Sequence, residues 1–300
     1  MPYLFTNLLK LSPFCGIMIA EGENMSEAGS INFKHHSPAD VPARPKIGLA
    51  LSGAVMRGPV HIGVLKVLQA AHIPVDVVAG ASAGSIVGAL FCAGLSPDDL
   101  ARVAPAIGWR AIARPVFPRR GFLSFARLEP WLIDLMGGDL QFSDLKIPLA
   151  ISATDLERGE AVTFTAGRVA PAVHGSSAVP GIVVPVAHDG YLLGDGGVSY
   201  NLPVAAARNL GADVVIGVDL FVPTIHRPWG PLRFGFAAIE TMVRRSGGGV
   251  DQADVLISPP ELAGVSYIRT GAKQAARLIA IGETAARRAL PQIEAVLAAA

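Results

Sequence analysis

A serine between two glycines, Ser82, stands where a chain can build a nucleophile. The local sequence is Gly80-Ala81-Ser82-Ala83-Gly84. Apolar, β-branched residues (VDVVAG) lead into it, and small apolar residues compatible with a helix follow it. A G-x-S-x-G segment at a sharp strand-to-helix turn is typical of a nucleophile elbow, which lifts the serine hydroxyl into the open. Such a hydroxyl becomes reactive only when a neighbouring base takes its proton.

Asp195 is one candidate for that base. It ends the apolar stretch of LLGDGGVSYNLP (192–203), and Gly196 and Gly197 follow it. Glycines allow a tight turn and a close approach by another backbone or a ligand. Taken alone, Asp-Gly-Gly is better explained as ordinary turn chemistry. The presence of Ser82 shifts the balance, because an ionised carboxylate within hydrogen-bond reach can orient and deprotonate a serine.

Histidine is the other candidate for the base. The seven histidines are His35, His36, His61, His72, His174, His188 and His226. A lone histidine is more often structural than catalytic, but His226 alone lies after the strand expected over 213–220. It would complete the chain order Ser…Asp…His of an α/β-hydrolase triad. The triad therefore stays open as an alternative to a Ser82–Asp195 pair.

A loop between the first expected strand and the first expected helix, SGAVMRG (52–58), offers a place for negative charge. Backbone N–H groups at a helix N-terminus favour an anion, and such donors stabilise an oxyanion. The loop should reach the same sheet edge as Ser82, at the carboxyl ends of the strands. The candidate oxyanion-hole residues are Gly53, Ala54, Val55, Arg57 and Gly58.

Two of the neighbouring side chains have two interpretations each. Arg57 would either fix the loop by hydrogen bonds or form an ordinary structural ion pair. Asn201 would either hold the loop that follows Asp195 in place or cap the helix that Pro203 begins. The sequence favours neither interpretation for Arg57.

Alternating apolar strands and helices must position these residues. Strands are expected over 47–52, 75–80, 146–155, 161–165 and 213–220, helices over 59–71, 82–92, 203–211 and 268–299, and a hairpin over 183–195 with Asp189-Gly190 in its turn. Strands that alternate with helices predict a mostly parallel sheet covered on both faces. The expected fold class is therefore α/β.

The bulk composition is compatible with this fold. The chain has 300 residues, 51% of them hydrophobic, enough for one large core. A net charge of +1 gives no reason to expect binding to nucleic acid. The two cysteines, Cys15 and Cys92, form no disulfide framework or zinc spacing, and we expect no metal or other cofactor.

The N-terminal residues differ in composition from the rest. Residues 1–45 include a polar stretch rich in Ser, Pro and Ala, and we expect a flexible tail there. The first residues make a poor signal peptide, and Met25 is an alternative start. Since no run of 18 uncharged apolar residues occurs, we expect a cytoplasmic protein, with contact at the membrane periphery left open.

With these motifs in order, the chain resembles the patatin-like phospholipases. The matching parts are Gly53 through Arg57-Gly58, the Ser82 elbow and Asp195-Gly196-Gly197, together with the linking blocks RGPVHIGVLKVL, DLKIPLAISATDLERGE and SSAVPGIVVPV. The resemblance implies a three-layer α/β/α sandwich. It implies a catalytic core over 46–222 and a C-terminal helical part over 223–300 that packs on this core.

The resemblance also implies a function. Members of the family use a serine–aspartate dyad without histidine, which here would be Ser82 and Asp195. The expected substrate is a lipid acyl ester, such as a phospholipid or a lysophospholipid.

One departure from the family pattern lies in the glycine-rich loop. The family usually has three glycines before x-Arg-Gly, whereas this chain has Gly53-Ala54-Val55. A loop conformation with positive φ is costly for Val55. We therefore expect an oxyanion hole that is reshaped, narrowed or lost. A catalytically weak protein that binds lipid stays open as a further alternative.

The segment WRAIARPVFPRRGFLSFARLEPW (109–131) mixes arginines with aromatic side chains. It would suit contact with an anionic membrane surface, with aromatic rings at the interface. An ordinary solvated lid over the core explains the same composition and is slightly preferred.

Overall fold

The computed structural model describes residues 44–221 and 231–300. The expected tail lies, up to residue 43, outside the described residues. In the described chain, eight strands form one sheet in the order β10-β9-β1-β2-β5-β8-β7, with β6 also paired to β5. The strands are β1 Ile47–Leu51, β2 Val77–Ala81, β5 Leu149–Asp155, β6 Glu160–Phe164, β7 Val186–His188, β8 Tyr191–Gly194, β9 Val214–Val218 and β10 Val255–Ile257. A separate short antiparallel pair joins β3 Arg114–Pro115 to β4 Leu123–Ser124.

Five strands of the sheet are mutually parallel. The strands β10, β9, β1, β2 and β5 run in one direction, and β6, β8 and β7 join as antiparallel neighbours. Every residue of β1, β2, β5 and β9 is buried. Continuous apolar runs fit these positions because helices cover both faces of the strands.

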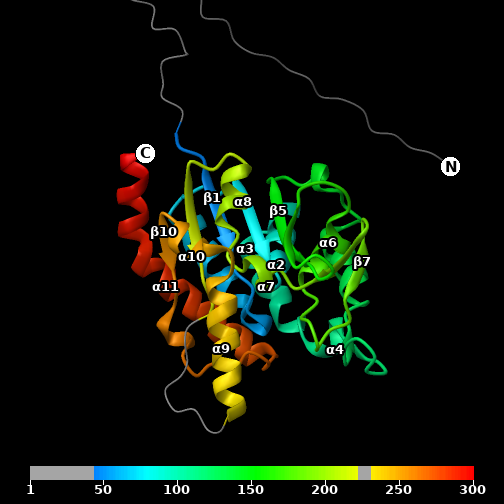
Figure 1. Ribbon diagram of the computed structural model, residues 1–300. Helices are drawn as coiled ribbons and strands as arrows, with labels where there is room; N and C mark the ends of the chain where they lie inside the picture. The colour runs from blue at the N-terminus through cyan, green and yellow to red at the C-terminus, as the bar shows by residue number, and fades with distance from the viewer. Residues whose placement is uncertain (1–43, 222–230) are drawn as a thin grey trace, which may run out of the picture. The chain divides into compact units, whose positions relative to one another are not determined.

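Helices cover both faces of this sheet (Figure 1). They are α1 Pro59–Ala70, α2 Ala83–Ala93, α3 Pro97–Val103, α4 Trp109–Ile112, α5 Leu128–Met136, α6 Val169–Ser176, α7 Gly197–Tyr200, α8 Val204–Asn209, α9 Pro231–Arg245, α10 Gly249–Gln252 and α11 Ala272–Ala299. Leu49 and Leu51 belong to the core that contains residues of α1, α2 and α11, whereas Ala50 packs in a second core with α8. Because successive strand residues point to opposite faces, these two cores lie on opposite faces of the sheet.

The observed architecture confirms the expected α/β class and three-layer α/β/α sandwich with a mostly parallel sheet. The turn of the hairpin β7–β8 has positive φ at both Asp189 (48°) and Gly190 (79°), as a two-residue hairpin turn favours. The strand expected over 213–220 is not the last one, however. Strand β10 follows and extends the sheet beside β9, but its three residues are too few to give a periodic signal.

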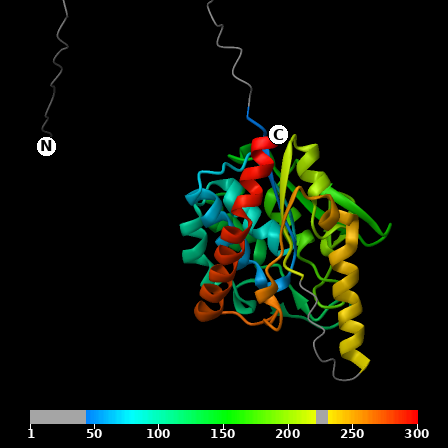
Figure 2. The same ribbon diagram turned by 90° about the vertical axis from the view of Figure 1, so that its left-hand side faces the viewer.

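The long C-terminal helix α11 packs closely on α1. A Cβ atom at Gly63 would lie 2.1 Å from the carbonyl oxygen of Ile279, and one at Gly282 would lie 2.0 Å from that of Val60. Glycines at both positions therefore let the two backbones touch. Figure 2 shows α11 on one flank, with α8, α10 and α9 on the other. No helix in the described part of the chain is both long and apolar enough to cross a membrane.

Candidate active site

Ser82 lies at the turn between β2 and α2. Its backbone has φ 48° and ψ −120°, a combination that is costly for a residue with a side chain. The turn is tight enough to require the glycines on either side. A Cβ atom at Gly84 would lie 2.2 Å from the carbonyl oxygen of Leu51, and one at Gly80 would lie 2.7 Å from that of Gly84. The geometry is that of a nucleophile elbow.

A second serine, Ser176, holds this elbow in place. The Ser82 N–H donates to Oγ of Ser176 at 2.8 Å, and that hydroxyl donates to the carbonyl oxygen of Ser152 at 2.7 Å. No sequence motif predicts this role for Ser176, which stands at the start of the block SSAVPGIVVPV. Local sequence could not predict this contact, because it joins the end of α6 to the end of β2, which are far apart in sequence.

Asp195 follows β8 and is brought to the same edge of the sheet. Its N–H donates to the Ala178 carbonyl oxygen at 2.8 Å, and the next N–H, of Gly196, donates to that of Ser176 at 3.1 Å. The segment that holds Ser82 therefore also holds the aspartate loop. A Cβ atom at Gly196 would lie 2.1 Å from the Ser152 carbonyl oxygen, so this turn needs glycine.

The two carboxylate oxygens of Asp195 have different surroundings. Oδ1 accepts the N–H of Gly197 at 2.8 Å, whereas Oδ2 is buried and has no hydrogen-bond partner among the described residues. Burial raises the pKa of Asp195 to about 6, against smaller lowering effects of the Ser82 hydroxyl and the Gly197 N–H. The Ser82 hydroxyl thus interacts with the carboxyl group, although no hydrogen bond of ordinary geometry joins them. Catalytic hydrogen bonds are often loose before substrate binds.

Asn201 joins the aspartate loop to the glycine-rich loop. Its Oδ1 accepts the N–H of Gly53 at 3.1 Å, and its own N–H donates to Oγ of Ser246 at 2.9 Å. Helix α8 receives no side-chain cap. Of the two roles considered from the sequence, Asn201 therefore holds the loop rather than capping α8.

The glycine-rich loop adopts the strained backbone expected for it. Val55 has φ 53°, in the left-handed region that β-branched residues avoid. The N–H of Met56 donates to the Tyr267 carbonyl oxygen at 3.0 Å, and the Gly53 N–H is taken by Asn201. Among the described residues, the amides of Ala54 and Val55 have no acceptor. These two amides are therefore available as hydrogen-bond donors.

Arg57 fixes the loop from its other end. Its fully buried guanidinium donates to the carbonyl oxygens of Leu220 (3.0 Å), Leu262 (3.1 Å) and Val265 (2.5 Å). Burial lowers its pKa, and the group lies 3.5 Å from the centre of the Tyr267 ring. Hydrogen bonds to carbonyl groups thus hold the loop. Gly58, the next residue, precedes α1 at the wall of a cavity.

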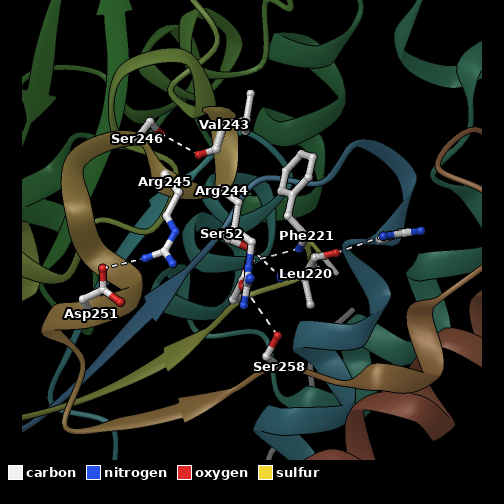
Figure 3. Close-up of polar contacts among 11 residues, drawn as sticks. Ser52, Leu220, Phe221, Val243, Arg244, Arg245, Ser246, Asp251 and Ser258 are labelled. Carbon is white, nitrogen blue, oxygen red and sulfur yellow. Dashed lines mark hydrogen bonds and ion pairs between the residues drawn. The ribbon is translucent and has the colours of Figure 1, made fainter. Parts of the chain in front are cut away.

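A network next to Arg57 braces the ends of β1 and β9 (Figure 3). Oγ of Ser52 accepts the N–H of Leu220 at 2.9 Å, and the buried carboxylate of Asp219 accepts from Arg244 of α9 at 2.7 Å. Residues near the end of α9 also reach the aspartate loop, because Oγ of Ser246 donates to the Gly197 carbonyl oxygen. The end of α9 and the residue that follows it, Ser246, therefore contact Asp219 after β9 and the aspartate loop.

No described histidine lines the cavity beside Ser82. His61 is buried in α1, with Nε2 2.9 Å from the Ser52 carbonyl oxygen, and burial lowers its pKa to about 4. It is therefore neutral and donates to that carbonyl. His174 contacts Glu129 at 2.7 Å. His226, the candidate third member of a triad, lies outside the described residues.

Ser82 opens onto a mostly apolar cavity of about 380 Å³. Its wall includes Val55 and Gly58 from the glycine-rich loop and many apolar side chains, among them Ile86, Trp109, Phe125, Val183 and Leu278. The volume lies within the usual range for a small-molecule site. The wall is suited to a hydrocarbon chain, and Ser82 is part of it.

The segment 109–131 divides into two parts around this cavity. Phe125 is buried and lines the cavity together with Trp109, which donates from its indole N–H to the Ile268 carbonyl oxygen at 2.9 Å. Phe117 and Phe122 are 81% and 63% exposed. The segment therefore covers the cavity as the lid interpretation expects, and it also presents aromatic side chains to solvent.

Comparisons with known proteins agree with this arrangement. An uncharacterized NTE family protein of Mycobacterium bovis is 35% identical over 179 residues, 59% of this chain and 49% of that protein. The lysophospholipase nte1 of Emericella nidulans is 32% identical over 180 residues, 58% of this chain and 12% of that protein. The chain thus spans about half the length of the mycobacterial relative and far less of the fungal one.

A solved structure and a family profile extend the comparison. VipD from Legionella pneumophila matches with a TM-score of 0.50 and 14% identity, over 83% of this chain and 67% of VipD, which shows a shared fold. The profile described as Patatin-like phospholipase matches residues 49–208, more than half of the chain. This range contains the glycine-rich loop, the Ser82 elbow and the aspartate loop. The chain belongs to the patatin-like phospholipase family.

Proposed function

We propose that this protein is a lipid acyl hydrolase of the phospholipase A, lysophospholipase or esterase type, with Ser82 as nucleophile and Asp195 as base. The observation that carries the proposal is the free Oδ2 of Asp195, buried beside a strained serine at the wall of an apolar cavity. Leaving a buried hydrogen-bond acceptor without a partner costs free energy. In the proposed reaction this oxygen accepts the proton of Ser82. The name of the fungal relative supports a lipid ester as substrate.

The proposed reaction has two halves. In the first, Asp195 accepts the Ser82 proton while Oγ attacks the ester carbonyl carbon, and the developing oxyanion accepts from the amides of Ala54 and Val55. The proton then passes from Asp195 to the leaving alcohol as the C–O bond breaks. In the second half, Asp195 deprotonates a water molecule that attacks the acyl-enzyme, and the proton returns to Ser82 as the fatty acid leaves. Each oxyanion donor contributes about 3 kcal/mol to such a step.

The acyl chain of the substrate is proposed to occupy the apolar cavity. Ser82 and Val55 both line the cavity, so a carbonyl group bound near them would place its hydrocarbon chain among apolar lining residues such as Ile86 and Leu278. Burial of a methylene group contributes about 0.8 kcal/mol, so binding should strengthen with chain length until the cavity is full. The substrate class is thus a fatty-acyl ester.

Labelling by a fluorophosphonate probe tests the proposed nucleophile and base. The probe forms a covalent bond with an activated serine, so the folded wild type should be labelled at Ser82, whereas Ser82→Ala and Asp195→Asn should not. Loss of labelling in both variants, with intact folding by circular dichroism, supports the dyad. Normal esterase activity in Ser82→Ala would contradict it.

Activity, labelling and vesicle-binding assays together distinguish the dyad from the two alternatives, a Ser-Asp-His triad and a catalytically weak lipid-binding protein. A triad of the α/β-hydrolase type predicts a large loss of activity in His226→Ala, whereas the dyad predicts little loss. A folded wild type that is not labelled, yet binds lipid vesicles, would favour a catalytically weak lipid-binding protein. The strained Val55 is the feature that motivates this last alternative.

We further propose that the segment 109–131 contacts a lipid surface at the mouth of the cavity. Phe117 and Phe122 are exposed, and the Phe122 N–H donates to the carbonyl oxygen of Ile182, which is itself 48% exposed. Arg119 and Arg120 are exposed between the two phenylalanines. Exposed aromatic rings beside cations fit the headgroup region of an anionic bilayer.

A further inference from the structure

The glycine-rich loop holds a strained residue at the point where its amides are needed. Val55 has φ 53° where the family that the chain resembles carries glycine, and such a conformation is strained for a residue with a side chain. Strain of this kind persists only when neighbouring contacts fix the backbone. The contacts of the two residues that follow, Met56 and Arg57, show what fixes it.

Tyr267 contacts both of these residues. Its carbonyl oxygen accepts the Met56 N–H at 3.0 Å, and its ring lies beneath the guanidinium of Arg57 at 3.5 Å. The Phe221 ring also packs near the Tyr267 ring, with 5.6 Å between the two ring centres. A cation over an aromatic face is attracted by the ring, most strongly where water is excluded, and the Arg57 side chain is fully buried.

The hydroxyl of Tyr267 adds only an electrostatic interaction with the Arg57 guanidinium to these contacts. Its oxygen is buried and has no hydrogen-bond partner among the described residues. Burial raises the pKa of this hydroxyl to about 12, so the group stays neutral at ordinary pH. The ring and the backbone carbonyl therefore make the contacts of defined geometry between Tyr267 and the loop.

We propose that Tyr267 is a positioning residue for the oxyanion hole: its ring under Arg57 and its carbonyl on Met56 hold Val55 in its strained conformation, so that the Ala54 and Val55 amides stay free for an anion. This inference rests on the proposed function. It makes a segment far along the chain, next to the cavity-lining residues 268–271, a working part of the site.

The test is a set of variants assayed on a p-nitrophenyl ester of a fatty acid. Tyr267→Phe keeps the ring and the carbonyl, so its kcat should stay within about twofold of wild type. Tyr267→Ala removes the ring, and its kcat should fall about 10- to 100-fold, part of the effect of losing an oxyanion donor, with KM changed less than about threefold.

Val55→Gly provides the decisive comparison. Glycine adopts positive φ without strain, so the loop no longer depends on Tyr267. The double variant Val55→Gly/Tyr267→Ala should therefore recover most of the kcat that Tyr267→Ala loses. An unspecific packing defect would not be rescued by a change at Val55.

Three outcomes would overturn the assignment while leaving the proposed function intact. These are an equal loss of kcat in Tyr267→Phe, a loss in Tyr267→Ala that appears only in KM, and a failure of Val55→Gly to rescue. A wild type that neither hydrolyses the ester nor reacts with the fluorophosphonate probe would instead overturn the proposed function, and this inference with it.

Discussion

At the scale of single residues, ionisation of Asp195 favours the proposed chemistry but opposes the stability of the fold. It is 7% exposed, and only one of its carboxylate oxygens is paired. Its pKa of about 6 keeps most of the carboxyl groups ionised at neutral pH, as a base requires. The same raised pKa means that ionising Asp195 costs more free energy in the folded protein than in the unfolded chain.

The pH dependence of activity follows from this pKa. The base must be deprotonated, so kcat/KM for a fatty-acyl ester should rise about tenfold per pH unit below pH 6 and level off above it. A pH–rate profile of wild type measures this directly. A midpoint near pH 4, the ordinary range of an exposed carboxyl group, would show that Asp195 is not the titrating base.

Removing the charge should stabilise the fold while abolishing activity. Between the ordinary pKa of 3.8 and about 6 the folded protein binds more protons at Asp195 than the unfolded chain, so stability falls as pH rises through this window. Asp195→Asn keeps an acceptor for the Gly197 N–H without the charge. Its free energy of unfolding should exceed that of wild type by up to about 3 kcal/mol at pH 8.

Denaturant unfolding of both proteins at pH 8 and at pH 4 checks this prediction. The difference should shrink toward zero at the lower pH, where Asp195 is protonated in the folded protein. A stability gain of equal size at both pH values would contradict the electrostatic explanation.

At the scale of elements, the backbones of α1 and α11 lie in direct contact at Gly63 and Gly282. A Cβ atom at Gly63 would lie 2.1 Å from a backbone oxygen of α11, and a backbone cannot turn aside as a side chain can. Gly63→Ala should therefore push the helices apart and lower the free energy of unfolding by about 1–3 kcal/mol or more, as overpacking does.

Gly235 of α9 offers a matched control. Among the described residues, no atom beyond its chain neighbours and the backbone of its own helix lies within 4 Å of a Cβ atom placed there. Because alanine forms helices better than glycine, Gly235→Ala should raise the free energy of unfolding by about 0.5–1 kcal/mol. Thermal unfolding of the two variants measures both effects, and a loss of equal size at both positions would contradict the close contact of α1 with α11.

At the scale of the whole molecule, the segment 109–131 both lines the cavity, through Trp109 and Phe125, and exposes Phe117 and Phe122 to solvent. Arg119→Glu/Arg120→Glu should weaken binding to vesicles that contain anionic lipid, because each cation near such a surface contributes about 1 kcal/mol. Hydrolysis of a short water-soluble ester should change little, since neither arginine lines the cavity.

The control for this variant is Arg287→Glu/Arg288→Glu, which makes the same charge change on the exposed side of α11. Co-sedimentation with anionic vesicles distinguishes the two. Equal weakening by both variants would show that only the net charge matters, and that the segment 109–131 is not a specific contact.

Much of the fold could be predicted from local sequence. The apolar runs of β1, β2, β5 and β9 and the Asp-Gly turn of the hairpin carry strong short-range signals. Strand β10 and the helices α3, α5 and α6 could not be predicted from local sequence, because their segments are short or mix polar with apolar residues. Their structure is decided by the surfaces on which they pack.

By itself, the sequence determined the α/β class and the chemical groups at the site. Ser82 between glycines, Asp195 before two glycines and Val55 in place of glycine are local facts, and each has a local backbone consequence. Only the tertiary structure decided which groups remain free. Asn201 accepts the hydrogen bond of the Gly53 amide, and the Tyr267 carbonyl oxygen accepts that of the Met56 amide. The Gly197 amide donates to one carboxylate oxygen of Asp195. Hydrogen-bond partners far apart in sequence are fixed by packing, which local patterns do not encode.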